Sequence, residues 1–561
     1  MADITPHNGT LDRKMAAHLL RRATFGPTKK EIDSFTGKTV DQAVNDLLVD
    51  QEIPIGPVDT TTGEPLVDPL NGKYKLDAGA DEDSGATDYF LSWWMARMNK
   101  SGLTLHEKMT FFMHAHFTTM KSKINESTAL YYQNAFFRFY ALGNFKTLCH
   151  KICFDNAMLR FLDGIQNEKG SPQENFGREL LELYSIGKGP QIDDGDYTTY
   201  TEDDVKAATK VLSGWGEDTT FETLDVDTGY AIGKLKTNDD PNTTSRHDSE
   251  EKTFSAKFNN QVIAPLNQSG GNTSVENAQE ELSVMIDMIF DSALTNKAAA
   301  KFICTRLYRY FVYYNVTPEV ESEIINALAD TFVANDYELK PVLAQLFKSK
   351  HFYDLDTTDI SSDNNVGAMI KSPLELVMGT LRFFQIVMPD PELEAASLEP
   401  VYSEVMKSME DQGMELYEPF EVAGYPAYHQ APIFTRNWIS ASWLGYRYLF
   451  SDILVAGELD KDNGVYGKLD IILYVENTEN VTDPRNANQM VKELVDDLLP
   501  MEVTEERFNY FLDAVLLDDL SSINWEFEWD TYKSSGDDTA VRGQLEKLLK
   551  AILQSPEYQL S

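Results

Sequence analysis

The chain has 561 residues, enough for two to four domains or one large helical body, and 42% of them are hydrophobic, as in an ordinary globular protein. Its 49 Lys and Arg residues against 90 Asp and Glu leave a net charge of −41, which repels phosphate backbones and anionic headgroups. We therefore expect no nucleic-acid partner, and three cysteines exclude a disulfide scaffold.

The N-terminal part, residues 1–51, is predicted to be helical because DRKMAAHLLRRATFG places apolar residues three and four positions apart. The start of the sequence lacks the apolar core of a secretory signal, and no window reaches the length of a membrane-spanning helix. We expect no membrane span, but export stays open because a signal could have been removed. Residues 52–88 are rich in Pro, Gly, Asp and Thr and predict an irregular loop.

Residues 89–215 are predicted to form a helical core that contains the segment TLHEKMTFFMHAHFTTM. Thr104 and Glu107 have capping-box spacing, so Glu107 is either a helix cap or a catalytic group. His114 shares a face with Glu107, whereas His116 points roughly 200° away from His114 on a helix. At most one of these histidines can therefore bind a given metal ion. The alternative is a buried, hydrogen-bonded histidine.

The next helix is predicted from GSPQENFGRELLELYSIGKG, where Ser171 and Glu174 have capping-box spacing and Gly187 supplies the end. Thr201 with Asp204 predicts a further helix start in TEDDVKAATKVLSGW. The acidic stretch between them, QIDDGDYTTYTEDD, resembles a calcium-binding loop only loosely. Structural calcium is therefore the minor interpretation of that stretch.

Three polar residues of the first of these helices fall on one stripe. Asn175, Glu179 and Glu182 are at i, i+4 and i+7, which would aim two carboxylates and an amide at one place. Arg178 and Glu182 are also at i and i+4, so the alternative is a solvated face with a helical salt bridge.

Residues 216–274 alternate short extended pieces with Asn, Asp, Gly and Ser clusters, so we predict a loop-rich insertion with a small hairpin. It contains His247 and Asp248, which could complete a site begun by His114 and Glu179. Mixed nitrogen and oxygen ligands suit zinc, iron or manganese.

Residues 275–458 predict a second helical part, and residues 459–561 a polar segment followed by helices. In GYPAYHQAPIFTRNWISASWLGYR, aromatic rings with Arg436, Asn437, Trp438 and Arg447 could line a carbohydrate or peptide cleft. Packing of the tryptophans in a helical core is the favoured alternative. No succession of strand and helix would build a parallel sheet. We predict a mainly α fold, a large multi-helix body with a loop-rich insertion.

Several segments together resemble, in order, the bacterial family called domain of unknown function 1800, over about residues 15–450. They are HLLRRATFGPT, EKMTFFMHAHFTT, ENFGRELLELYSIGKG, YTEDDVKAATKVLSGW, RHDSEEKTF, IKSPLELVMGTLRFF and GYPAYHQAPIFTRNWISASWLGYR. The resemblance identifies relatives, many of them exported, without implying an activity. One departure matters: Tyr184 stands where the family usually has a histidine. If that histidine binds a metal in relatives, the tyrosine must replace it or the site is lost.

The resemblance gives weight to polar residues because core packing alone would not produce such motifs. Its counterparts here are His18, Glu107, His114, His116, Glu174, Asn175, Arg178, Glu179, Glu182, His247, Asp248, Lys252, Trp438 and Arg447.

Two main functions follow. The first is a metal-dependent hydrolase of an extracellular polymer or anionic glycan. In it His114, Glu179, His247 and Asp248 hold the ion, Glu182 or Glu107 is the general base, and Arg178 pairs with an anionic substrate group. The second is a non-catalytic cell-envelope binding or assembly protein, with a carbohydrate or protein partner, whose polar motifs form a buried network. A smaller alternative is a metal-free carboxylate pair, Glu179 with Asp248.

Overall fold

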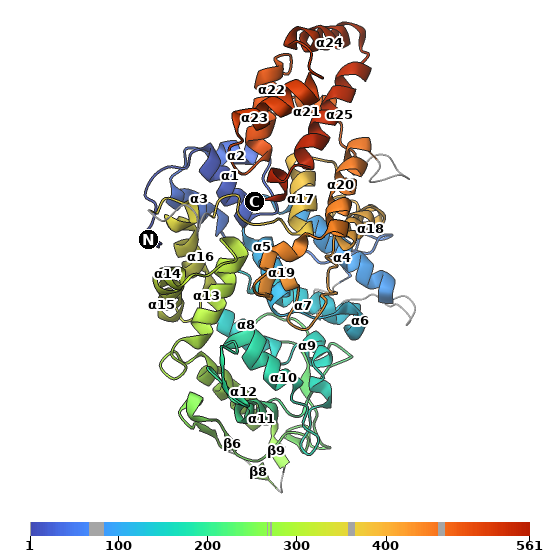
Figure 1. The fold of residues 1–561 in the computed structure, drawn as a ribbon. Helices are drawn as coiled ribbons and strands as arrows, with labels where there is room; N and C mark the ends of the chain where they lie inside the picture. Colours follow the sequence, from blue (N-terminus) through green and yellow to red (C-terminus); the bar gives the residue numbers. More distant parts are fainter. Residues whose placement is uncertain (1, 67–82, 266–267, 270–271, 357–364, 458–465) are drawn as a thin grey trace.

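The structure is a computed structural model that describes residues 2–66, 83–265, 268–269, 272–356, 365–457 and 466–561. It is mainly α, as predicted, and elongated: the C-terminal helices project at one end and the strand-containing insertion lies at the other (Figure 1). One hydrophobic cluster runs through the molecule, from Ala2 to Tyr558. The described cysteines, Cys149, Cys153 and Cys304, are buried and unbridged, as expected for reduced thiols.

The N-terminal part is helical, and each of its helices starts at a side-chain cap that a polar residue supplies. The elements are α1 (Arg13–Ala23), α2 (Lys29–Phe35) and α3 (Val40–Leu47). The predicted loop 52–88 ends earlier than expected, since α4 (Asp83–Lys100) begins inside it, while residues 67–82 lie outside the described residues.

The helices that follow α4 form the centre of the molecule. They are α5 (His106–His116), α6 (Lys121–Ile124), α7 (Ser127–Phe139), α8 (Phe145–Ile152), α9 (Asn156–Phe161), η1 (Gly164–Gln166), α10 (Asn175–Glu179), η2 (Leu180–Ser185) and α11 (Glu202–Val211). Every residue of α5 is buried, including the charged side chains of Glu107 and Lys108. A polar side chain on this helix must therefore find a partner inside the protein.

Short strands are confined to the segment after α10, in four small sheets of the described chain whose pairs are all antiparallel. They are β1 (Gln191–Asp193), β2 (Asp196–Tyr197), β3 (Trp215–Gly216), β4 (Lys234–Leu235), β5 (Thr243–Thr244), β6 (Lys252–Thr253), β7 (Val262–Ile263), β8 (Gln268–Ser269) and β9 (Asn272–Ser274), with η3 (Ala256–Phe258) between β6 and β7. In register, Trp215 faces Leu235 and Lys252 faces Ile263. The insertion thus holds more than the one hairpin predicted.

The second helical part and the C-terminal helices complete the body. They are α12 (Val275–Phe290), α13 (Ala298–Phe311), α14 (Pro318–Val320), η4 (Glu321–Ile325), α15 (Asn326–Ala334), α16 (Leu339–Lys348), η5 (His351–Tyr353), α17 (Pro373–Phe383), α18 (Ala395–Asp411), α19 (Pro426–His429), η6 (Phe434–Trp438), α20 (Ala441–Ala456), α21 (Ile471–Glu476), α22 (Ala487–Leu498), α23 (Glu505–Asn509), η7 (Tyr510–Leu516), α24 (Ser522–Ser535), α25 (Thr539–Leu553) and η8 (Glu557–Gln559). Figure 1 shows α5, α13 and α19 together at the centre, and α13 contacts both α19 and η2.

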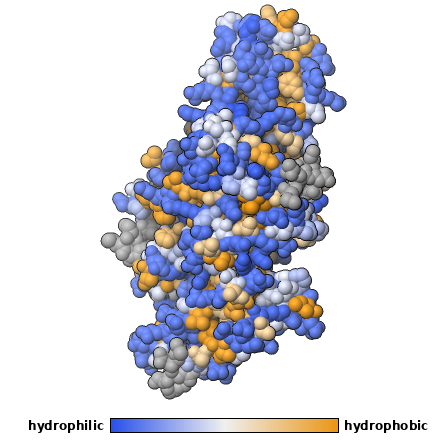
Figure 2. Space-filling model, turned by 90° about the vertical axis from the view of Figure 1, so that its left-hand side faces the viewer, coloured by the Kyte–Doolittle hydropathy of each residue, from blue (hydrophilic) through white to orange (hydrophobic). Residues whose placement is uncertain are grey.

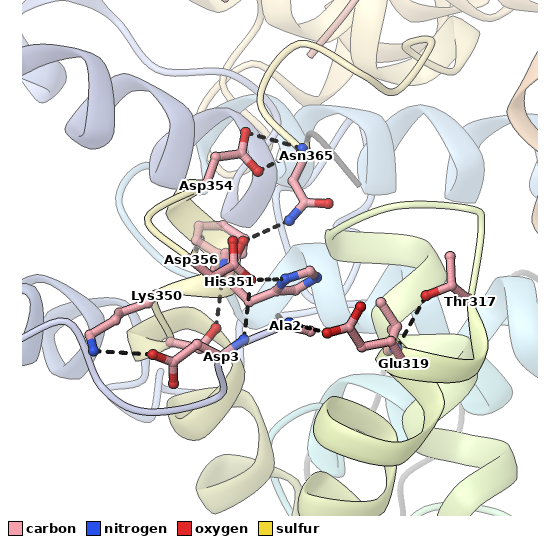
Figure 3. Close-up of polar contacts among 12 residues, drawn as sticks. Ala2, Asp3, Thr317, Glu319, Lys350, His351, Asp354, Asp356 and Asn365 are labelled. Atoms are coloured by element: carbon pink, nitrogen blue, oxygen red, sulfur yellow. Dashed lines mark hydrogen bonds and ion pairs between the residues drawn. The ribbon is translucent and has the colours of Figure 1, made fainter. Parts of the chain in front are cut away.

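The N-terminal residues are tied to the body by a buried histidine–carboxylate pair. Nδ1 of His351 lies 2.6 Å from Asp356 Oδ2, and the same oxygen accepts the backbone N–H of Asp3 at 3.1 Å (Figure 3). The backbone N–H of Ala2 donates to Glu319 Oε1 at 3.1 Å. This is a structural role for a histidine that the sequence motifs did not indicate.

The surface matches the acidic composition. Hydrophilic side chains predominate on the face in Figure 2, with hydrophobic ones scattered among them. Within the described ranges, no helix has both the length and the apolar character that crossing a bilayer requires.

Candidate functional site

Glu107 and His114, predicted to act in catalysis and metal binding, both lie in the interior on α5. Glu107 does not cap the helix, because α5 starts at Leu105 without a side-chain cap. It instead accepts two hydrogen bonds from Arg138, at 2.6 Å from Nε and 3.1 Å from Nη2. His114 is fully buried among aromatic rings, and its Nε2 lies 3.4 Å from the Tyr425 hydroxyl. Burial lowers the pKa of His114 to about 3, so this imidazole is neutral.

His247 forms a second buried network, at the insertion. Its Nδ1 lies 2.8 Å from Ser213 O and its Nε2 lies 2.9 Å from Glu281 Oε2. Glu281 also accepts a hydrogen bond from Lys252, whose ammonium donates to Asp248 O at 2.6 Å as well. The carboxylate of Asp248 accepts the backbone N–H of Glu250 and does not approach the imidazole as a second ligand would.

The four predicted metal ligands therefore do not meet. His114 sits among aromatic rings, His247 is bonded to Glu281, and Glu179 lies on α10 with neither of them as a partner. Across the part of the chain that the structure describes, no group of three or more His, Cys, Asp and Glu side chains could hold a metal ion. The structure does not bring the predicted four-residue centre together, and residues 191–204, the stretch that resembles a calcium loop, form the β1–β2 hairpin and the cap of α11.

The helix that carries Glu179 differs from the predicted one. It starts at Asn175, without a side-chain cap, because Ser171 is held in a turn in which its N–H bonds to Glu168 O at 2.9 Å. The helix end is as predicted, since Gly187 has a φ of +69°, which favours glycine. From Leu180 to Ser185 the chain is a π-helix, a form often found at functional sites. Its wider turn separates Glu182 from the stripe expected for an α-helix.

The charged side chains around η2 have clear partners, with one exception. Arg178 binds Glu202 through two contacts of 2.6 Å, and Glu182 accepts from the Tyr200 hydroxyl at 2.6 Å and lies 3.1 Å from Lys188 Nζ. Neither pairing is the i, i+4 bridge between Arg178 and Glu182 that the spacing suggested.

Glu179 is the exception. It is half-buried and makes no hydrogen bond or ion pair with any described residue. Burial, together with the negative charge of Glu182, raises the pKa of Glu179 to about 7. Near neutral pH this carboxyl group is therefore present in both protonation states.

Tyr184 connects Glu179 to a second group of polar residues. Its hydroxyl is buried next to the Thr118 hydroxyl, which donates to Val422 O and can accept the tyrosine O–H. Burial raises the pKa of Tyr184, the charge of Glu179 adds to that rise, and the charge of Arg306 opposes it. The backbone of Tyr184 also holds His116, whose Nε2 lies 3.0 Å from Tyr184 O.

Arg306, on α13, is a half-buried cation with little to bind it. Its one hydrogen bond goes to Ala115 O at 3.4 Å, and no carboxylate of the described residues lies within ion-pair distance. Burial lowers the pKa of Arg306 to about 10, which leaves it charged at neutral pH. Its positive charge contributes to the lowered pKa of both His116 and His429, after burial of each imidazole. Arg306 also lines a small cavity of ≈ 10 Å³, room for about one water molecule.

The predicted substrate-binding residues of the 424–447 segment divide into two pairs. Trp438 is buried against Tyr425 and Tyr428, and Arg447 is buried with its Nη2 donating to Lys371 O at 2.8 Å. Trp438 thus packs in the core, the alternative that we weighed for the tryptophans, and Arg447 is buried as well. Arg436 is exposed and lies over the Tyr314 ring at 5.3 Å, while Asn437 is half-buried with an unbonded amide nitrogen.

Sequence reasoning missed Arg306, Arg138 and Glu281, which decide how the predicted residues are used. Each belongs to a helix far along the chain from its partner, and each looks like an ordinary charged helical residue. An unpaired arginine in the long apolar stretch FICTRLYRYF was the available signal for Arg306.

Comparisons with known proteins agree with the motif pattern. The family described as Protein of unknown function (DUF1800) matches residues 18–560, nearly the whole chain. Neither a curated protein nor a solved structure matches it.

Proposed function

The chain belongs to the DUF1800 family, and on that premise we propose that it is a hydrolase in which Glu179 transfers protons and Arg306 binds an anionic group of the substrate. The observation that carries this proposal is the carboxyl group of Glu179, which is half-buried but has no hydrogen-bond or ion-pair partner among the described residues. The other predicted catalytic residues are occupied: Glu107 by Arg138, Glu182 by Tyr200 and Lys188, and Arg178 by Glu202.

The chemistry suits general acid–base catalysis. A carboxyl group whose pKa lies close to the working pH can both accept and return a proton. The Glu179 carboxylate would take a proton from the attacking water as its oxygen bonds to the substrate. When the bond to the leaving group breaks, the leaving oxygen would receive that proton. The half-exposed position of Glu179 keeps it within reach of a bound molecule.

Arg306 makes an anionic substrate the best match. A chain with a net charge of −41 repels anions at long range, so capture of one requires a local cation without a carboxylate partner. Arg306 meets that requirement, and its neighbour Arg309 has an unbonded Nε and no ion pair with a carboxylate of the described residues. An anionic glycan or another anionic polymer outside the cell remains the substrate class we propose.

The test is a panel of nitrophenyl esters, phosphate and sulfate esters, and neutral and acidic glycosides. We expect wild-type protein to hydrolyse an anionic member, Glu179→Gln to lower kcat about 100-fold or more, and Arg306→Gln to act mainly on KM. Glu174→Gln, a carboxyl change just before the same helix, is the matched control and should retain activity. Full activity in Glu179→Gln, or no hydrolysis by the wild type, would overturn the proposal.

Metal dependence, predicted from the sequence, is measured in the same assay. Protein is treated with a chelator and then supplied with zinc, iron or manganese, and its metal content is determined directly. A stoichiometric metal that is required for turnover would support the metal-dependent form of the hydrolase.

A second candidate, the binding or assembly protein, is favoured by the ion-pair networks at Glu107 and His247. Networks in which each buried charge has a partner can fix one arrangement of a helical core. If the Glu179→Gln protein keeps full turnover, or if the wild type hydrolyses no substrate, the binding or assembly function takes precedence.

A further inference from the structure

A large cavity lies apart from the Glu179 and Arg306 groups, where the insertion packs on α8 and α12. Its volume is ≈ 800 Å³, within the range of about 300–1,000 Å³ that small-molecule sites occupy. Residues of α8, α12 and the chain between β3 and β4 line it, so its walls come from segments well separated in sequence (Figure 1).

One wall of the cavity is aromatic. The rings of Phe154 and Trp215 are stacked, with centroids 5.4 Å apart and an angle of 24° between planes. Ile232, Leu235 and Leu282 extend the apolar surface. A flat or aliphatic molecule would bury its own apolar surface against these side chains, which is the main favourable term in such binding.

The charged side chains that line the cavity are already neutralised. Lys151 is bonded to Asp225 and to Asp227, the latter at 2.6 Å. Lys234 is paired with Asp218 at 2.9 Å. The remaining two charges are paired as well, Lys236 with Glu168 and Glu217 with Arg160. A charged ligand would therefore find no unpaired opposite charge in the cavity, whereas an uncharged ligand needs none.

Two further residues of the wall are uncharged. Trp215 is 4% exposed, and its Nε1 is buried out of reach of a bound molecule. His150, whose pKa burial lowers to about 4, is neutral at pH 7.

From this wall chemistry we infer that the cavity binds an uncharged aromatic small molecule. This binding site is independent of the proposed hydrolase site, because none of its lining residues is Glu179, Tyr184 or Arg306.

The test uses N-phenyl-1-naphthylamine, an uncharged aromatic amine whose fluorescence rises in apolar surroundings, with the full chain. We expect saturable binding of one probe per chain. Ser283→Trp, which places an indole in the lining, should weaken binding about tenfold or more. Val284→Trp is the matched control, since Val284 is the next residue of α12, is 40% exposed and does not line the cavity.

The preference for an uncharged ligand has its own probe. The anionic 1-anilinonaphthalene-8-sulfonate should bind about tenfold more weakly than the uncharged probe.

Equal binding to the Ser283→Trp and Val284→Trp proteins would overturn the proposal, as would equal affinity for the sulfonated and uncharged probes. If Ser283→Trp fails to fold, as judged by circular dichroism, Gln279→Trp fills the cavity from one turn earlier on α12 and is read in the same way.

Discussion

Replacing Glu107 by Gln should destabilise the fold by about 3–5 kcal/mol, the usual cost of breaking a buried ion pair by removing one partner. Glu107 is 5% exposed and Arg138 2%, so neither is screened by solvent. The lower end of the range is expected, because the Gln oxygen can still accept one N–H of Arg138 and because Asn134 Oδ1 remains 2.8 Å from Nη1. The residual penalty is the guanidinium charge left without a carboxylate.

The same pair predicts a pH dependence. Burial alone would raise the pKa of Glu107, but the charge and hydrogen bonds of Arg138 outweigh it and hold the pKa below 4.5. A carboxyl with a depressed folded-state pKa contributes stability that is present above its unfolded pKa and is lost as pH falls through the folded value. The difference between wild type and Glu107→Gln should thus be constant near neutral pH and shrink in acid below the ordinary value of 4.5.

Urea unfolding followed by circular dichroism measures both effects, at pH 7 and in acid. Glu107→Leu with Arg138→Met removes both charges and should recover most of the loss. Asp203→Asn, which breaks an exposed ion pair with Lys206, is the control and should leave the unfolding free energy nearly unchanged. A loss under about 1 kcal/mol for Glu107→Gln, or no recovery in the double variant, would refute the reasoning.

Three further changes follow from other contacts. Glu281→Gln should lower Tm at pH 7 because it leaves the buried Lys252 ammonium without its carboxylate. The Tm difference from wild type should shrink in acid, as pH falls through the depressed pKa of Glu281, and an equal Tm loss at pH 7 and in acid would contradict this. Glu179→Gln should raise Tm at pH 8 but not at pH 4, because a carboxyl whose pKa is raised to about 7 in the folded state makes the fold less stable as pH rises from 4.5 through 7. A Tm gain at pH 4 would argue against this. Thr201→Ala should cost about 1 kcal/mol in urea unfolding because it removes the cap that pairs with Asp204; no change would show that the cap is dispensable.

The helices were predictable because their signals are local. The capping box at Thr201 and Asp204 forms as expected, and His114 and His116 point to different partners because α5 is regular. The Ser171 capping box failed because the backbone of Ser171 closes a turn with Glu168. Helix α21 was missed inside the predicted polar segment because its six residues are too few to show a period.

The candidate site was less predictable because its contacts are distant in sequence. Spacing on one helix could not show that Glu107 meets Arg138 or that His247 meets Glu281, since each pair joins two elements. We predicted that Glu179 and Glu182 share one stripe because we assumed an α-helix. The π-helix of η2 changes the direction of the side chains that follow Glu179, including Glu182.

Cations in a structural scaffold and cations in a binding site differ in how well their charges are paired. A scaffold needs each buried charge to be satisfied, because an unsatisfied one destabilises the fold. Arg138 meets that need with a carboxylate, whereas Arg22 and Arg447 donate to carbonyl oxygens at 2.6–2.8 Å and each keep a buried nitrogen without a partner among the described residues. Arg306 is only half-buried, with one hydrogen bond of 3.4 Å and no carboxylate of the described residues within ion-pair distance. Local rules are broken in natural proteins mainly where function requires it. The anion that we propose at Arg306 would supply the partner that this half-buried guanidinium lacks among the described residues.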